Sequence, residues 1–361
     1  MASMSRGPRN DLTDVGGIAV GHHQRIGRGW LTGTTVVIPP RGAVGGVDVR
    51  GGGPGTRETD TLNPINLVSN VDAICLSGGS AYGLDAATGA MGFLAERNRG
   101  FTVGPEPHHV VPIVPGAVLF DLGRGGRFEH RPDASFGYRA ASRARPRPIA
   151  QGNVGAGTGA FAGRLKGGIG SASVVTPAGI TVAALVALNS AGSPVDLGTG
   201  LLWGAAHGVG DEFAHLRRPS AAERKAFAAL HEMPRALNTT LAIVATDASL
   251  SKAECTRMAG AGHDGMARAL KPIHTYTDGD VVFALATGAH CDAPSDGEPC
   301  ADADVSPSQL AAARLMELAV IFTAAADAVA RAIVHATLAA ATVGDHLSYL
   351  DQFPSAVRRG L

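Results

Sequence analysis

The chain has 361 residues, of which 45% are hydrophobic and 17% are charged, and its 31 basic residues are balanced by 31 acidic residues. The hydrophobic content excludes an intrinsically disordered chain. A formal net charge of zero gives no electrostatic basis for binding nucleic acid or an anionic membrane surface.

The first half of the chain alternates short apolar runs with glycine-containing turns. Thr34–Ile38 and Ala73–Leu76 are typical of buried strands, and Leu84–Glu96 is predicted to be a helix. Val110–Leu122 is predicted to be a further strand region. The basic and polar segment Phe128–Arg147 is predicted to lie on the surface.

The second half contains clearer strand signals. Ser173–Val175 and Ile180–Leu188 flank a Pro-Ala-Gly turn, which predicts a hairpin. Thr239–Asp247 and Asp280–Thr287 are apolar and rich in β-forming residues, so both are predicted to be strands.

Three helices of the second half are marked by their starts. Capping boxes Ser220-x-x-Glu223 and Ser251-x-x-Glu254 each open a helix. Ser306-Pro307 opens a third helix, predicted to run to about Ala341. With no βαβ regularity and no repeats, the pattern predicts a single layered α/β domain in which helices pack on mostly antiparallel sheets.

Targeting and redox signals are weak. Residues 1–14 are polar and hold no apolar stretch of the kind found in signal peptides, and the apolar segment Leu315–Thr342 is interrupted by charged residues, which argues against a membrane span. Of four cysteines, Cys75 is expected in the core and Cys255 in a helix, while Cys291 and Cys300 bracket a polar loop. No C-x-x-C spacing suggests a zinc site, and we expect a reduced, cytoplasmic protein.

Two glycine-rich motifs have alternative interpretations. Gly155–Ala160 fits a dinucleotide-binding pattern but lacks the strand before it and the helix after it, so we interpret it as a close-packed loop that could line a substrate cleft. Ser80 follows a strand and precedes a helix without a G-x-S-x-G elbow, so we expect it to cap the helix that begins near Ala81. The amides of that helix start could bind an anionic group.

Two polar motifs precede the apolar strands of the second half. Asn238-Thr239-Thr240 stands before one strand, and Asp278-Gly279-Asp280 stands before the other. Alone, Thr239 is simply a β-branched residue that starts a strand. Two carboxylates one residue apart tend to raise the pKa of one of them, which suits acid–base chemistry, although an exposed turn explains them equally well.

These motifs occur together with others in one order. They include Asn10-Asp11-Leu12-Thr13-Asp14, Val49-Arg50-Gly51-Gly52, the 152–159 and 166–170 glycine runs, Ala187-Leu188-Asn189 and Ala245-Thr246-Asp247. From Asp11 to about His335 the chain resembles the self-processing peptidase family of the D-aminopeptidase/esterase, the β-peptidyl aminopeptidases and the nylon-oligomer hydrolase. Its Asn-Thr and Asp-x-Asp motifs resemble the nylon-oligomer branch. The resemblance implies an α-β-β-α sandwich over residues 1–361 and a homo-oligomer, with tetramers typical of the family.

The resemblance also implies roles for individual residues. The precursor would cut itself between Asn238 and Thr239, giving fragments 1–238 and 239–361, and Thr239 would become the N-terminal nucleophile. Asp278 and Asp280 would orient its amine and hydroxyl. Lys166 matches the family's lysine and would supply positive charge that helps keep the amine neutral and the carboxylates ionised, although a small gap would place Arg164 there instead.

Further positions follow from the same resemblance and from the glycine motifs. Asn189 matches the family's asparagine and is expected to donate to the oxyanion. Phe120 stands where the family has a tyrosine near the site. With Tyr82, Gly155 and Gly157, it is assigned to substrate binding.

The implied chemistry agrees with general principles. A threonine hydroxyl needs a base, and an N-terminal amine with an ordinary pKa near 7.7–8.0 can act as that base. The acyl-enzyme would then be hydrolysed by water, with no metal or other cofactor. We therefore predict an aminopeptidase or short-oligoamide hydrolase acting on small peptide or oligoamide substrates. A self-cleaving acyltransferase of the ornithine acetyltransferase kind, or an unprocessed binding protein, are the alternatives.

Overall fold

The computed structural model describes residues 4–230, 237–290 and 306–358. The strands are β1 (Ser5–Arg6), β2 (Ala19–Gly27), β3 (Trp30–Ile38), β4 (Val44–Val49), β5 (Thr56–Arg57), β6 (Ile74–Ser77), β7 (Phe101–Thr102), β8 (Val110–Val111), β9 (Gly116–Val118), β10 (Phe161–Ala162), β11 (Leu165–Lys166), β12 (Gly168–Val175), β13 (Thr181–Leu188), β14 (Leu241–Thr246) and β15 (Val281–Ala286). The α-helices are α1 (Asp85–Ala95), α2 (Ala134–Ser142), α3 (Ala221–Ala229), α4 (Lys252–Ala269), α5 (Pro307–Ala339) and α6 (Tyr349–Gln352).

Two sheets form the centre of the molecule. One has six strands in the order β1-β12-β13-β14-β15-β4, and the other has five in the order β2-β3-β6-β9-β5. Among the described strands of these sheets, β14–β15 and β6–β9 pair in parallel and the other pairs are antiparallel. Both sheets are therefore mostly antiparallel, as the sequence predicts.

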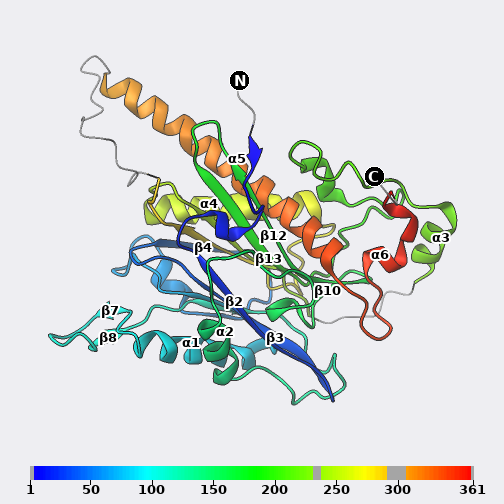
Figure 1. The fold of residues 1–361 in the computed structure, drawn as a ribbon, viewed down its shortest axis with the longest axis horizontal. Helices are drawn as coiled ribbons and strands as arrows, with labels where there is room; N and C mark the ends of the chain where they lie inside the picture. The colour runs from blue at the N-terminus through cyan, green and yellow to red at the C-terminus, as the bar shows by residue number, and fades with distance from the viewer. Residues whose placement is uncertain (1–3, 231–236, 291–305, 359–361) are drawn as a thin grey trace.

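Helices cover the outer faces of the two sheets, which gives four layers (Figure 1). Helices α4 and α5 lie on the six-stranded sheet, and α1 and α2 lie on the five-stranded sheet. Strand β13 shows the pattern in its alternation: Val182 and Val186 face the α4–α5 layer, whereas Leu185 faces the other sheet. The predicted α-β-β-α sandwich is confirmed.

Most predicted elements of the second half are confirmed. The hairpin is β12–β13, and the two apolar strands are β14 and β15, which lie side by side. The predicted capping boxes at Ser220 and Ser251 are formed at the starts of α3 and α4. The predicted Ser306-Pro307 start opens α5, and the structure adds a capping box there between Ser306 and Gln309.

Two expectations for the first half are wrong. The segment 128–147 is not only surface, because it contains α2, whose Phe136 and Ala140 pack against the five-stranded sheet and α1. Ser80 does not cap a helix: its φ is +51°, and the 3₁₀ turn that it begins has no side-chain cap. The predicted strand region at 110–122 does contain strands, the short β8 and β9.

Helix α5 is long and apolar enough to cross a membrane by length and composition, but 61% of its most apolar stretch is buried inside the protein. Its buried face, which includes Val329 and Ile333, packs in the apolar layer above β12 and β13. This is the position of a core helix. Cys75 and Cys255 are buried in apolar clusters, while Cys291 and Cys300 lie outside the described residues.

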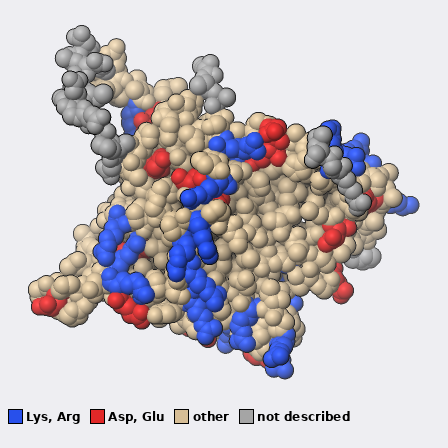
Figure 2. Space-filling model, in the orientation of Figure 1, with Lys and Arg blue, Asp and Glu red and all other residues tan. Residues whose placement is uncertain are grey.

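A net charge of zero does not mean an even surface. Figure 2 shows Lys and Arg side chains in bands on the lower half of one face and a broad uncharged area to the right of its centre.

Candidate active site

Thr239 lies just before β14, in the middle of the six-stranded sheet, and its exposure is only 5%. Its backbone N–H donates to the carbonyl oxygen of Asn189 at 2.6 Å. Asn189 directly follows β13, and the antiparallel pairing of β13 with β14 is what brings these two residues together. The sheet itself therefore sets the position of Thr239.

The carbonyl oxygen of Asn238 receives two hydrogen bonds. One comes from the hydroxyl of Thr239, the next residue, and the other from the backbone N–H of Gly279 at 3.0 Å. A parallel bridge between Asn238 and Asp278 holds the two segments together. The carbonyl oxygen of the Asn238–Thr239 peptide bond thus has two donors, the hydroxyl of Thr239 and a backbone N–H.

Gly279 must be a glycine at this position. A Cβ placed there would lie 2.7 Å from Thr239 Oγ1 and 2.7 Å from the carbonyl oxygen of Gly53. Side chains do not tolerate such contacts, so the Asp-Gly-Asp motif can approach Thr239 only because its middle residue has no side chain.

Asp278 and Asp280 are both fully buried and lie immediately before β15. The carboxylate of Asp278 accepts hydrogen bonds from the Ala191 N–H at 3.3 Å and the Thr275 hydroxyl at 2.7 Å. Burial raises the pKa of Asp278, and the charge of Asp280 raises it further. The interpretation of this motif as an exposed turn is therefore wrong.

The carboxylate of Asp280 connects the two strands. Its Oδ1 accepts the N–H of Thr240 at 2.7 Å, and its Oδ2 accepts both the N–H of His274 at 3.1 Å and the Nδ1–H of the same residue at 2.9 Å. The sequence analysis assigned no role to His274. Its position six residues before Asp280 is the signal in the sequence that could have indicated a role, but the contact between His274 and Asp280 is visible only in the folded loop.

Lys166 is fully buried in β11, and its ammonium donates to the carbonyl oxygens of Gly157, Ala160 and Gly167 at 2.7–3.1 Å. Burial lowers the pKa of Lys166 well below its ordinary value, and the neighbouring Arg124 lowers it further. Its proton is therefore easier to remove than that of a surface lysine. This weakens the expectation that Lys166 acts as a fixed positive charge.

The side-chain amide of Asn189 is fixed mainly through its oxygen. Its Oδ1 accepts hydrogen bonds from Arg124 and from the N–H of Phe161, and its Nδ2 donates to the carbonyl oxygen of Phe120 at 3.5 Å. The donor end of the amide therefore has only this long contact within the described part of the chain. Arg124, which the sequence analysis did not select, fixes the orientation of the amide.

A further buried carboxylate, that of Asp121, lies near Arg124 and Lys166. Asp121 accepts the N–H of Gly79 at 2.7 Å, and burial raises the pKa of Asp121 to about 6, an effect that Arg124 and Lys166 reduce. Asp121, Arg124 and Lys166 thus form a buried cluster of ionisable side chains beside Asn189.

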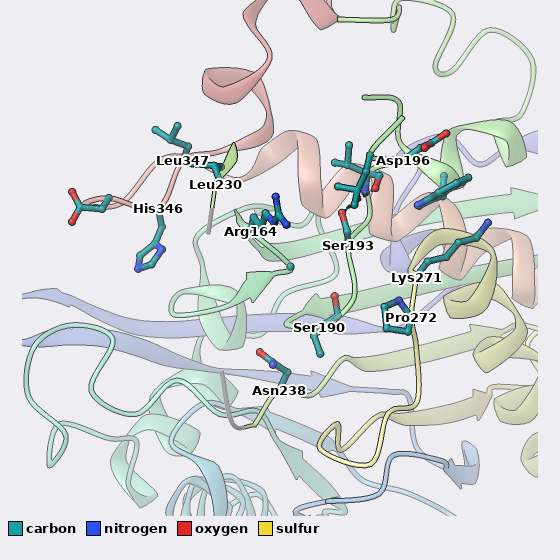
Figure 3. Close-up of a pocket in the computed structure, with 16 residues that line it drawn as sticks. Arg164, Ser190, Ser193, Asp196, Leu230, Asn238, Lys271, Pro272, His346 and Leu347 are labelled. Carbon is teal, nitrogen blue, oxygen red and sulfur yellow. Dashed lines mark hydrogen bonds between the residues drawn. The ribbon is translucent and has the colours of Figure 1, made fainter. Parts of the chain in front are cut away.

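A pocket of 920 Å³ opens beside the Asn238–Thr239 bond (Figure 3). Asn238 and Ser190 lie at one end, and Arg164, Lys271 and Asp196 contribute charged groups to the walls. Apolar surface comes from Val195, Leu197, Trp203, Leu230 and Leu347. The pocket is therefore mixed in character and large enough for an extended ligand.

The residues assigned to substrate binding lie elsewhere. Tyr82 is 53% exposed and stacks under the guanidinium of Arg131 at 3.6 Å, and it does not line this pocket. Gly155 and Gly157 are buried in a 3₁₀ turn, where the carbonyl of Gly157 binds Lys166. The structure thus groups Asn238, Thr239, Asn189, Asp278 and Asp280. Phe120 contacts Asn189 through its carbonyl oxygen, and its ring centroid lies 6.0 Å from the guanidinium carbon of Arg124.

No three His, Cys, Asp or Glu side chains gather closely enough to hold a metal ion in the described ranges 4–230, 237–290 and 306–358.

The sequence was compared with known proteins. The profile of peptidase family S58 matches residues 10–347. This chain belongs to peptidase family S58. It is 50% identical over 358 residues to an uncharacterized aminopeptidase of Mycobacterium tuberculosis, with 96% of this chain and 99% of the relative covered. It is also 33% identical to a 6-aminohexanoate-oligomer endohydrolase of Kocuria sp., with 76% of this chain and 74% of the relative covered.

Solved structures of this peptidase group share the fold. The L-aminopeptidase D-Ala-esterase/amidase of Ochrobactrum anthropi, described as a variant of the Ntn-hydrolase fold, aligns with a TM-score of 0.69 over 99% of this chain and 98% of that one at 19% identity. A β-aminopeptidase of Burkholderia sp. aligns with a TM-score of 0.66 over 100% of this chain and 98% of that one at 24% identity. The family resemblance stated from the motifs is confirmed.

Proposed function

We propose that this chain is an amide-bond hydrolase that activates itself by cutting between Asn238 and Thr239. The observation that carries this proposal is the pair of hydrogen bonds on the Asn238 carbonyl oxygen, from the Thr239 hydroxyl and the Gly279 N–H. The groups that the reaction needs are already in contact in the continuous chain.

The first step is attack of Thr239 Oγ1 on the carbonyl carbon of Asn238. Negative charge develops on the carbonyl oxygen in this step. The oxygen keeps its hydrogen bond from the Gly279 N–H, which stabilises the charge as in an oxyanion hole. Collapse breaks the C–N bond, the proton from the hydroxyl goes to the leaving nitrogen, and an ester remains. Water then hydrolyses this ester and leaves Asn238 with a free carboxylate and Thr239 with a free amine.

The same residue then acts on substrates. The new amine of Thr239 is within reach of its own hydroxyl and can take its proton as the base. The Asp278–Asp280 pair lies beside this group, and Lys166, whose pKa burial lowers, is the further ionisable residue that the family resemblance assigns to the reaction. The acyl-enzyme forms on Thr239 Oγ1 and is hydrolysed by water.

The two fragments, 1–238 and 239–361, are expected to stay together after the cut. Strand β14 of the second fragment pairs along its length with β13 of the first, and β15 pairs with β4 of the first. Because β14 and β15 of the second fragment lie between β13 and β4 of the first in one sheet, separating the fragments would expose the central apolar layers. The processed protein should therefore behave as one folded unit.

The substrate is proposed to be a small aminoacyl amide or a short oligoamide. The acyl group of such a substrate would replace Asn238 on Thr239, at the end of the 920 Å³ pocket. Relatives named as aminopeptidases and as 6-aminohexanoate-oligomer endohydrolases support this substrate class.

The test uses a matched pair of adjacent threonines. Thr239→Val removes the proposed nucleophile and should leave an intact chain on a denaturing gel and by intact mass. Thr240→Val removes a buried hydroxyl that has no hydrogen-bond partner in the described residues, so this variant should still yield a fragment that begins at Thr239. Fragments that form in Thr239→Val as fast as in the wild type would refute the proposal. Added amine acceptors with product analysis distinguish hydrolysis from acyl transfer.

A further inference from the structure

The carboxylate of Asp280 is fixed at both oxygens, and His274 supplies two of its three donors. The backbone N–H and the ring Nδ1–H of His274 both reach Oδ2, while the Thr240 N–H, one residue after the proposed nucleophile, reaches Oδ1. His274 thus links the loop before β15 to the start of β14 through a single carboxylate.

The backbone at His274 is unusual. Its φ is +54°, in the left-handed region that most residues other than glycine avoid, and His, Asn and Asp are among the few enriched there. This conformation lets the backbone N–H and the side chain of one residue bond the same oxygen. The geometry is therefore specific to this carboxylate rather than a general feature of the loop.

The ring of His274 is held by a second histidine. His263, from α4, packs against it edge to face with ring centroids 4.7 Å apart. His263 Nε2 lies 2.9 Å from the carbonyl oxygen of Asp48 on β4, so Nε2 carries the proton. Burial lowers the pKa of His263 to about 4, so this ring stays neutral at ordinary pH and forms a rigid wall behind His274.

We propose that His274 is a positioning residue that orients the Asp280 carboxylate beside Thr239 during self-cleavage and turnover. This inference rests on the function proposed above. Because Asp280 Oδ1 bonds the Thr240 N–H, rotation of the carboxylate would release the backbone next to the nucleophile. The ring N–H of His274 opposes that rotation.

Three substitutions separate the effect of losing the side-chain donor of His274 from the effect of changing its backbone conformation. His274→Asn keeps an N–H donor near the position of Nδ1 and tolerates positive φ. His274→Gly removes the donor but relaxes the left-handed backbone, and His274→Ala removes the donor and strains the backbone. We expect His274→Gly and His274→Ala to process and turn over about 10- to 100-fold more slowly, the usual effect of losing a hydrogen bond to a charged group. His274→Asn should recover most of that loss.

The readouts are the rate at which the Thr239-terminated fragment appears and the kcat and KM on a small aminoacyl anilide. Thermal unfolding is measured on the same samples. The proposal predicts a lower kcat with little change in KM, and recovery in His274→Asn whatever the small differences in Tm. Wild-type rates in His274→Gly, or His274→Asn as slow as His274→Gly, would overturn it. If the wild-type protein itself never yields a fragment that begins at Thr239, the proposed self-cleavage is refuted, and this outcome is distinct from the outcomes that overturn the role of His274.

Discussion

Replacing Gly279 by alanine tests the proposed self-cleavage at its closest contact. The added Cβ would lie 2.7 Å from Thr239 Oγ1, 2.7 Å from the Gly53 carbonyl oxygen and 3.2 Å from Pro54 Cα. Two of these three contacts are shorter than side chains accept, and two involve backbone, so the loop or the nucleophile must move. Overpacking of this kind costs about 1–3 kcal/mol of the free energy of unfolding.

The effect on cleavage should exceed the effect on stability. A shift of Gly279 weakens its N–H bond to the Asn238 carbonyl oxygen, which is 3.0 Å long in the native chain. Removing one donor from an oxyanion typically slows acyl transfer by about 10²–10³-fold. We therefore expect Gly279→Ala to accumulate as a full-length chain during hours in which the wild-type chain is cut.

The assay follows full-length chain and fragments over time by denaturing gel and intact mass, with Tm measured in parallel. Gly53→Ala is the matched control in the neighbouring loop, because its added Cβ would meet no atom closer than the Asp278 carbonyl oxygen at 3.8 Å. Cleavage of a folded Gly279→Ala protein at the wild-type rate would refute the role assigned to the Gly279 amide and to the close packing around Thr239.

Three further substitutions test the buried ionisable groups. Asp278→Asn should slow fragment formation and turnover at least about 100-fold, as removal of a catalytic acid–base group does, and an unchanged rate on the gel would show that Asp278 only supports the turn. Lys166→Met removes three buried hydrogen bonds from the ammonium, although the carbonyl oxygens of Gly157 and Ala160 keep backbone donors from Ala160 and Gly167. Because each bond from a charged donor contributes about 1.5–3 kcal/mol, its Tm should fall, and an unchanged Tm would contradict the described contacts. Asp121 has a pKa raised from 3.8 to about 6 by burial, so its contribution to stability is present below pH 3.8 and is lost as the pH rises through 6. At about 1.36 kcal/mol per pKa unit, the wild-type protein should lose at most about 3 kcal/mol of its free energy of unfolding over this pH range. Urea unfolding of Asp121→Asn should not show this loss. Parallel plots of stability against pH for the wild type and Asp121→Asn would exclude this assignment.

The sequence was sufficient for elements whose signals are local. The capping boxes at Ser220 and Ser251, the Ser306-Pro307 helix start and the turn of the β12–β13 hairpin depend on residues within a few positions of one another, and the structure contains all of them. Helix α2 was missed because the 128–147 segment around it carries five arginines, of which only Arg139 lies in the helix, and this composition suggested a surface segment. Its buried stripe consists only of Phe136, Gly137, Ala140 and Ala141, which is too short and too small to stand out from the polar residues around it.

The candidate site was predictable only where a family motif marked it. Asn238-Thr239 and Asp278-Gly279-Asp280 were selected by resemblance, and the structure places them side by side. His274 and Arg124 were missed because their roles depend on partners in other segments of the chain. A left-handed backbone at His274, or an arginine bonded to Asn189 from 65 residues away, leaves no periodic trace in the sequence.

One contact in the continuous chain is suited to both stages of the proposed mechanism. The Thr239 N–H already donates to the Asn189 carbonyl oxygen at 2.6 Å, and cleavage turns this nitrogen into an amine without moving Asn189. Because a carbonyl only accepts, it will continue to bind an N–H of the amine and so direct the lone pair away from Asn189. The backbone of Asn189, fixed by the pairing of β13 with β14, thereby orients the base, while its side chain, held by Arg124, stays available to the substrate side. The register of β13 and β14 therefore positions three groups at once, the nitrogen and the hydroxyl of Thr239 and the carbonyl of Asn238, which is more than any single catalytic side chain positions.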